Sequence, residues 1–92
     1  MNVFEGDNRK RITSTDSTIK SPNSGPQLFL LGVFVSQASN TPTLTVADSL
    51  DIIANTFTPI AGQFYILPCQ INGTLTVTIG GTVDATIFYG SN

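Results

Sequence analysis

The residues able to do chemistry are few in this 92-residue chain. It contains no histidine, and Cys69 is its single cysteine. A serine or cysteine nucleophile needs a base to take its proton, and that base is normally histidine. Cys69 follows Pro68 and has no neighbouring cation in the sequence to lower its pKa. We therefore expect Cys69 to be a small packing residue, and we expect no catalytic residue and no enzyme activity.

Three carboxylates, Asp48, Asp51 and Asp84, are the only charged groups after Lys20. Asp48 and Asp51 flank one polar turn, where aspartate commonly accepts hydrogen bonds from backbone N–H groups. The same carboxylates with Ser49 offer oxygen ligands for calcium, but their spacing does not follow a calcium-loop motif. A structural zinc site lacks its histidine and cysteine ligands. We therefore predict that Asp48 and Asp51 cap this turn, and we expect no bound metal and no cofactor.

All four cations of the chain lie within its first twenty residues. These residues have a net charge of +1, whereas residues 21–92 have a net charge of −3. Nucleic-acid binding requires a sustained basic patch, and a run of three cations is short for that purpose. We therefore expect no nucleic-acid partner and assign the segment to protein contacts. The predicted partner-binding residues are Arg9, Lys10, Arg11, Ile12, Ile19 and Lys20.

Residues 1–26 have the composition of an extended N-terminal arm. They are rich in asparagine, aspartate, serine and threonine, and they end in the turn-forming cluster 21–26, Ser-Pro-Asn-Ser-Gly-Pro. Segments 11–15 and 17–20 have some β-propensity, but neither has enough apolar residues to form a core alone. We predict an arm over 1–26 that is disordered when free, followed by a folded body over 27–92.

The body is predicted to be all-β. Residues 28–35 are apolar on both faces, as in a strand covered on both sides, while 74–79 alternate with a period of two. Residues 36–42 are expected to form a polar loop, and Gly80-Gly81 a tight hairpin turn. Turn signals separate about six short segments, which predicts a small antiparallel β-sandwich. The predicted strands are 28–35, 43–48, 52–57, 63–67, 74–79 and 83–89.

The small size and neutral surface of this body favour oligomerisation. A domain of about seventy residues buries only about 60% of the surface that its unfolded chain exposes. Such domains usually gain stability from disulfides, metals or association, and the sequence has no pair of cysteines and few metal ligands. Threonines occupy the outward strand positions where charges usually protect sheet edges. These threonines form either a neutral β-stabilising surface or contacts with identical subunits.

Export and membrane insertion are not expected from this sequence. The N-terminal residues are polar and lack the apolar core of a signal peptide. The longest apolar stretch, 28–35, is far shorter than a membrane span. The sequence Asn72-Gly73-Thr74 matches a glycosylation motif, but Asn-Gly is also a strong turn pair, which is the interpretation we favour.

Residues 25–89 resemble a family of small virion proteins of tailed bacteriophages. The resemblance lies in the order of four short motifs and departs from the family pattern at Thr74, which separates Gly73 from Leu75. The motifs are Gly25–Val35 (GPQLFLLGVFV), Pro42–Asp48 (PTLTVAD), Ala61–Tyr65 (AGQFY) and Gly73–Tyr89 (GTLTVTIGGTVDATIFY). The resemblance implies a small β-sandwich that is jelly-roll-like.

The function that this resemblance implies is that of a non-enzymatic virion structural protein. We expect a capsid cement or decoration subunit that binds the shell through its arm and oligomerises through its body. Its partners would be the major capsid protein or another virion protein, and its location the virion, assembled in the host cytoplasm. The alternatives are a neck or tail component that forms a ring, and a fibre component that binds a receptor or carbohydrate. Phe64, Tyr65 and Phe88 are the candidate sugar-binding aromatics, although the absence of tryptophan favours core and interface roles for them.

Overall fold

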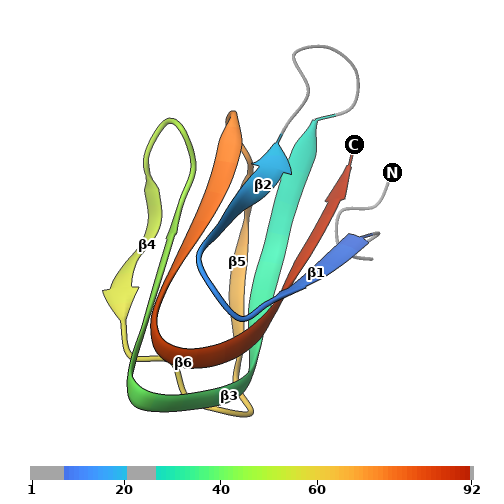
Figure 1. Ribbon diagram of the computed structural model, residues 1–92. Coiled ribbons are helices and arrows are strands. Elements are labelled where there is room, and N and C mark those ends of the chain that lie inside the picture. Colours follow the sequence, from blue (N-terminus) through green and yellow to red (C-terminus); the bar gives the residue numbers. More distant parts are fainter. Residues whose placement is uncertain (1–7, 21–26, 92) are drawn as a thin grey trace.

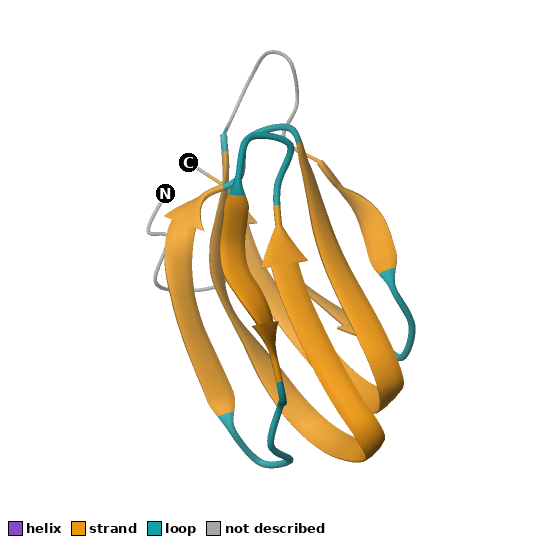
Figure 2. Cartoon of the chain, turned by 90° about the vertical axis from the view of Figure 1, so that its left-hand side faces the viewer, coloured by secondary structure: helices purple, strands orange, loops and turns teal. Residues whose placement is uncertain are grey.

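The fold consists of six antiparallel strands in one sheet (Figure 1). The computed structural model describes residues 8–20 and 27–91. Within these ranges there are only strands and loops, with no helix (Figure 2), which confirms the all-β prediction. The strands are β1 (Asn8–Ile12), β2 (Asp16–Lys20), β3 (Leu28–Ala47), β4 (Ile52–Phe57), β5 (Phe64–Gln70) and β6 (Thr74–Ser91).

Strands β3 and β6 are long, pair with each other and bend together halfway along. The first half of β3 pairs with the second half of β6, from Leu28 opposite Ser91 to Ser39 opposite Thr82. The second half of β3 pairs with the first half of β6, ending with Ala47 opposite Thr76. In Figure 1 the two strands form nested U-shapes, so the single sheet folds over on itself.

The bend divides the sheet into two half-sheets that face each other. The first half-sheet has the order β1, second half of β6, first half of β3, β5. The second half-sheet has the order β2, first half of β6, second half of β3, β4. The sequence predicted a sandwich, and the structure has one continuous sheet whose two halves are joined through the bent strands.

The bend is built by residues with left-handed backbone conformations. Asn40 and Thr41 on β3 have φ of 58° and 53°, and Gly81 on β6 has φ of 68°. Glycine takes such angles without steric cost, and asparagine takes them more easily than most residues. The Asn40 side chain donates a hydrogen bond of 3.0 Å to the hydroxyl of Thr82, which links the two strands at the bend.

Two sequence predictions at this bend were wrong. Residues 36–42 are part of β3 and do not form a loop, and Gly80-Gly81 is not a hairpin turn. A hairpin there would pair 74–79 with 83–89, whereas both segments pair with β3. The strand number agrees with the prediction, but two pairs of predicted strands are merged and two strands come from the N-terminal segment.

The hydrophobic core lies between the two half-sheets. Inward and outward side chains alternate over stretches of the strands, and the alternation shifts at irregularities such as that between Leu30 and Gly32 of β3. No polar or charged residue is buried in the described ranges. The buried residues are Ile12, Ile19, Leu30, Val33, Val35, Leu44, Val46, Ile71, Leu75, Val77, Val83, Ala85 and Ile87.

The described part of the predicted arm belongs to this fold. Strand β1 pairs with β6, with Ile12 opposite Ala85, and β2 pairs with β6, with Ile19 opposite Leu75. Ile12 and Ile19 are only 5% and 4% exposed. Each strand therefore has backbone pairing on one edge and one apolar anchor in the core, which is the stabilisation that the isolated segment lacks. Residues 1–7 and 21–26 of the predicted arm lie outside the described residues.

Candidate functional site

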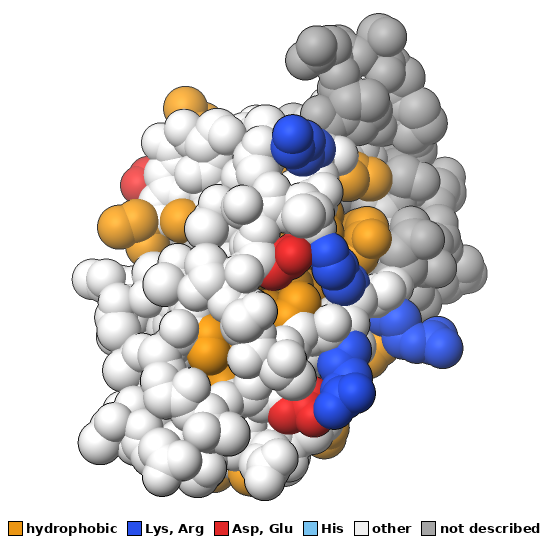
Figure 3. All heavy atoms as spheres, in the orientation of Figure 1, with side chains coloured by type: hydrophobic (Ala, Val, Ile, Leu, Met, Phe, Trp, Pro, Cys, Tyr) orange, Lys and Arg blue, Asp and Glu red, His pale blue; other side chains and the backbone are white. Residues whose placement is uncertain are grey.

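The predicted partner-binding residues separate into two groups in the structure. Ile12 and Ile19 lie in the core, so the structure does not place them on a free surface. The four cations are on β1 and β2, and Figure 3 shows them along one side of the molecule. We call this side, with its two aspartates, the charged edge. Its residues are Arg9, Lys10, Arg11, Asp16, Lys20 and Asp84.

Two of these cations are paired within the chain. Arg11 donates from Nε to one oxygen of Asp84 at 2.8 Å and from Nη2 to the other at 2.5 Å. This two-point hydrogen bond from Arg11 lowers the pKa of the Asp84 carboxyl. Lys10 donates to Asp16 at 2.9 Å and also contacts the hydroxyl of Thr18. Both pairs join strands, but exposed ion pairs add little stability.

Arg9 and Lys20 differ from the other two cations. Both side chains are exposed, and neither has an ion-pair partner within the described part of the chain. Arg9 lies on β1, and Lys20 is the last residue of β2. The prediction that Arg9 and Lys20 contact a partner protein stays a prediction.

The opposite edge of the sheet is apolar. Strands β4 and β5 end the two half-sheets on the side away from β1 and β2. All the large hydrophobic side chains that are strongly exposed in the described ranges come from these strands and the loops beside them. We call them the apolar edge: Leu50 (77% exposed), Ile52 (55%), Ile60 (60%), Phe64 (40%) and Ile66 (68%). Segment 50–66 contains no cation and a single carboxylate, Asp51.

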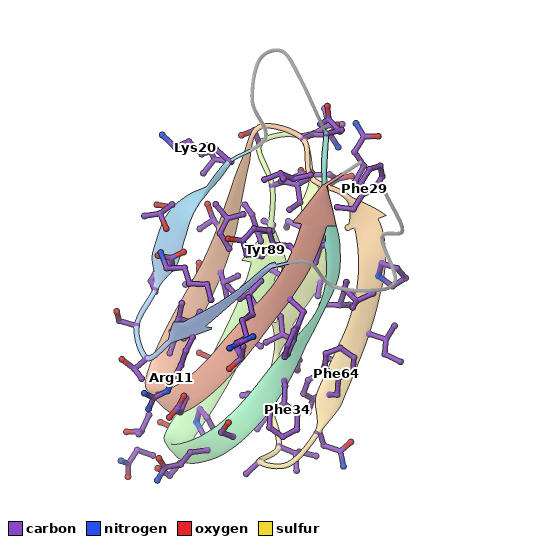
Figure 4. All side chains as sticks on the ribbon, turned by 90° about the vertical axis from the view of Figure 1, so that its right-hand side faces the viewer. Arg11, Lys20, Phe29, Phe34, Phe64 and Tyr89 are labelled. Carbon is purple, nitrogen blue, oxygen red and sulfur yellow. The ribbon has the colours of Figure 1, made fainter. Side chains whose placement is uncertain are left out.

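An aromatic patch continues the apolar edge onto the outer face of the first half-sheet. Leu31, Phe34, Phe64 and Phe88 line an open hollow of about 320 Å³. The rings of Phe64 and Phe88 meet edge to face, with centroids 5.8 Å apart and planes at 87°. Phe34 and Phe64 lie side by side on β3 and β5 in Figure 4. We call these four residues the aromatic patch.

The structure brings together only two of the three aromatics named from the sequence. Phe64 and Phe88 share the aromatic patch, whereas Tyr65 points inward because neighbouring strand residues face opposite sides. Its ring lies 4.8 Å from that of Phe57, and its hydroxyl accepts a hydrogen bond from the Ile60 N–H at 2.9 Å. Tyr65 is therefore a partly buried residue that packs against the core.

Sequence reasoning missed Leu31 and Phe34. The run 28–35 is apolar at every position, which predicted a strand covered on both faces. Leu31 and Phe34 are instead only half-buried, since no layer of the described chain covers the outer face of the first half-sheet. The doubly apolar pattern was the available signal, and it marked an open apolar surface as well as a core.

Asp48 forms the turn cap that its position predicted. One carboxylate oxygen accepts the N–H groups of Leu50 and Asp51, both at 2.9 Å. The other accepts the backbone N–H of Asn72 at 2.9 Å and its side-chain amide at 3.2 Å. Burial raises the pKa of Asp48, but these hydrogen bonds together outweigh it and leave the pKa lowered. Its oxygens therefore face N–H donors.

Cys69 and the carboxylates show no arrangement for chemistry in the described ranges. The Cys69 side chain is half-buried on β5 and packs against the core. Burial, and then the charge of Asp48, raise the pKa of its thiol, which disfavours the reactive thiolate. No group of three or more histidine, cysteine, aspartate and glutamate residues there is placed to hold a metal ion.

Comparison with known proteins identified no relative. A scan against protein-family models, a search of curated proteins and a search of solved structures found no match to this chain. Among the described residues there is also no helix long and apolar enough to cross a membrane. The features available for interpreting function are the charged edge, the apolar edge and the aromatic patch.

Proposed function

We propose that this chain is a non-enzymatic structural subunit of a bacteriophage virion, a cement or decoration protein of the capsid. The observation that supports a role in assembly is that the charged edge and the apolar edge lie on opposite sides of one small sheet. The charged edge holds the exposed cations Arg9 and Lys20, and the apolar edge holds five exposed hydrophobic side chains. Free proteins normally protect sheet edges with charges, so an uncharged apolar edge favours a neighbour that covers it.

The virion assignment rests on the family resemblance of residues 25–89 and on the order of strand segments. Dividing β3 and β6 at their bends leaves four segments in each half-sheet. Every connection passes from one half-sheet to the other, except the one between β3 and β4. This order supports the proposal of a jelly-roll-like fold, an arrangement found in viral capsid proteins and also in lectins and cupins. A fold alone does not define function.

The proposed contact with the shell differs from the one expected from the sequence. A flexible arm would bind by becoming ordered on the shell, whereas β1 and β2 are already paired to β6. The cations of the charged edge would therefore meet acidic groups of the capsid from a rigid surface. Rigid presentation avoids the entropic cost of ordering a chain on binding. Arg9 and Lys20 would make the contact, because Lys10 and Arg11 already have carboxylate partners.

The test uses particles assembled without this chain and purified protein added back. The double variant Arg9→Ala/Lys20→Ala should bind these particles at least about tenfold more weakly than the wild type, measured by co-sedimentation. The matched control Lys10→Ala/Arg11→Ala removes the same amount of charge, but from cations that are paired within the chain. Its affinity for the particles should be closer to that of the wild type than the affinity of Arg9→Ala/Lys20→Ala is. Equal binding by wild type and Arg9→Ala/Lys20→Ala would reject the charged edge as the contact.

The aromatic patch supports a second candidate function, that of a fibre or neck component that binds carbohydrate. Exposed aromatic rings can stack on sugars, and Phe34, Phe64 and Phe88 lie together. Sugar sites also need polar groups beside the rings, and all four side chains that line this hollow are apolar. A glycan array distinguishes the candidates: saturable binding to a glycan, lost in Phe64→Ala, would favour carbohydrate binding over the cement role.

A further inference from the structure

We propose that β5 pairs antiparallel with β5 of a second copy of this chain, about a two-fold axis that passes at Tyr65. This inference deepens the proposed assembly role and rests on it for the expectation that the chain self-associates. The pairing does not require that the assembly be a virion.

One edge of β5 is free to pair. In the described ranges β5 pairs with β3 alone, and Val33 lies opposite Tyr65 in that pairing. Just before β5, the Val35 N–H donates to the Gln63 carbonyl at 2.9 Å, and the Val35 carbonyl accepts from Gly62 at 2.7 Å. The backbone of Val35 therefore points toward the β5 side of β3.

The alternation of backbone groups then fixes which β5 residues face outward. Because the groups of successive strand residues point to opposite edges, Val33 also points toward β5, and its partner Tyr65 points toward β3. The N–H and C=O groups of Phe64 and Ile66 consequently point away from β3, toward the free edge. This direction concerns only their backbone, since their side chains lie on the outer face.

The side chains at this edge suit a second strand. Phe64 and Ile66 are 40% and 68% exposed and uncharged, whereas most exposed edges are protected by lysine or other charges. The protecting device present is Pro68, which has no N–H to donate. Pro68 would end the new ladder without preventing pairing over 64–66.

A second copy fits this edge better than a charged partner does. A two-fold contact places one patch against the same patch, and a patch without cations has no like charges to repel. The cations lie at β1 and β2, on the other side of the sheet, so pairing through β5 keeps the charged edges of the two copies apart. The copies would form one continuous sheet across the axis.

The geometry specifies the register. With Tyr65 on the axis, Phe64 of one copy lies opposite Ile66 of the other, and the reverse pair follows by symmetry. Each pair would exchange two backbone hydrogen bonds, since both residues direct their N–H and C=O groups to the free edge. Each would also set an aromatic ring beside a β-branched side chain, a favourable cross-strand combination.

Cross-linking tests this register. On a Cys69→Ser background, oxidation of a mixture of Phe64→Cys and Ile66→Cys chains should yield mainly mixed disulfide dimers, since directly opposite strand residues lie within disulfide reach. Either chain alone should cross-link much less. A Leu50→Cys chain, exposed on the same side but outside β5, provides the matched control. Mixed dimers no more abundant than those formed with Leu50→Cys would overturn the register.

The oligomeric state tests the contact itself. Sedimentation equilibrium of the wild type should show a dimer, and Ile66→Lys should weaken it at least about tenfold by placing cations at the axis. Leu50→Lys should leave it unchanged, and circular dichroism should show both variants folded. A monomeric wild type at high micromolar concentration, or equal weakening by both variants, would overturn the pairing. Binding to particles is measured in a separate experiment. A wild-type dimer that fails to bind particles would therefore count against the proposed function and not against the β5 pairing.

Discussion

The carboxylate of Asp48 organises two loops that are distant in sequence. It accepts N–H groups from the turn that follows it and from Asn72 in the loop between β5 and β6. A second link joins the same loops, because the hydroxyl of Ser49 accepts the Thr74 N–H at 2.9 Å. The turn signal was local and could be predicted, whereas the contact with Asn72 requires the folded sheet.

Replacing Asp48 tests how much its hydrogen bonds between the two loops contribute to the free energy of unfolding. Asp48→Ala should lower the free energy of unfolding by about 2 kcal/mol, because several N–H donors lose a charged acceptor. Urea denaturation measures the change. Asp51→Ala is the control, since the Asp51 carboxylate is exposed and accepts one N–H group, that of Ile52. An equal loss in the two variants would mean that the link between the loops contributes nothing.

The lowered pKa values of Asp16, Asp48 and Asp84 predict the direction of the pH dependence. A carboxyl with a folded-state pKa below its unfolded value is stabilising above the unfolded value, which is about 4. That contribution is lost as the pH falls through the folded-state pKa, because the unfolded chain then binds more protons. The urea midpoint should therefore fall on acidification below about pH 4. Asp48→Asn should reduce this dependence, and an unchanged pH profile would contradict the role of Asp48 in it.

At the scale of elements, the bend in β3 and β6 is the feature that makes a single sheet enclose a core. Gly81 has a left-handed backbone and lies against the carbonyls of Asn40 and Thr41, so an added side chain would collide with them. Gly62 has a similar backbone, with φ of 87°, but stands in open space. A substitution at Gly62 therefore has the cost of backbone strain alone, whereas a substitution at Gly81 has that cost and the cost of a collision.

The pair of alanine variants tests the bend directly. Gly62→Ala should lower the free energy of unfolding by about 1 kcal/mol, from the left-handed backbone alone. Gly81→Ala should lower the free energy of unfolding clearly more than Gly62→Ala does, because the bend must also open to relieve the collision. Thermal and urea unfolding of both variants provide the comparison. Similar losses in the two would show that the bend tolerates a side chain.

At the scale of the whole molecule, chain segments from both ends close the same core. Ile12 and Ile19 lie in one cluster with Val83, Ala85 and Ile87 of β6. The molecule also has two chemically different sides, with cations on β1 and β2 and exposed hydrophobic residues on β4 and β5. A dimer through β5 would leave a charged edge at each end, so the proposed contact with a capsid could be made at more than one site.

Removal of the N-terminal segment tests its place in the fold. From the sequence alone, deletion of residues 1–20 should leave a folded body, whereas the structure predicts that it exposes one edge of β6 along both half-sheets. The truncated chain should therefore unfold or aggregate. Ile12→Ala and Ile19→Ala in the full chain should each lower the free energy of unfolding by about 2–4 kcal/mol. A truncated chain that keeps the wild-type melting temperature would contradict this assignment.

The sequence by itself determined the all-β class, the places of most strand segments and the cap at Asp48. These features follow from side-chain alternation and turn chemistry, which act between near neighbours in the chain. The low charge content of residues 21–92, three aspartates and no cation, likewise led to the prediction of a surface for assembly before any strand was placed.

Tertiary structure alone decided which segments pair and which faces remain open. Gly80-Gly81 suits a hairpin turn as well as a bend, and the choice was made by the pairing of both flanking segments with β3. Segment 8–20 has too few apolar residues to form a core alone, and its strands pair with β6, as in the pair between Arg11 and Asp84, which are 73 residues apart. Such pairings depend on competition among distant strands for the same backbone groups. Local patterns carry no information about that competition.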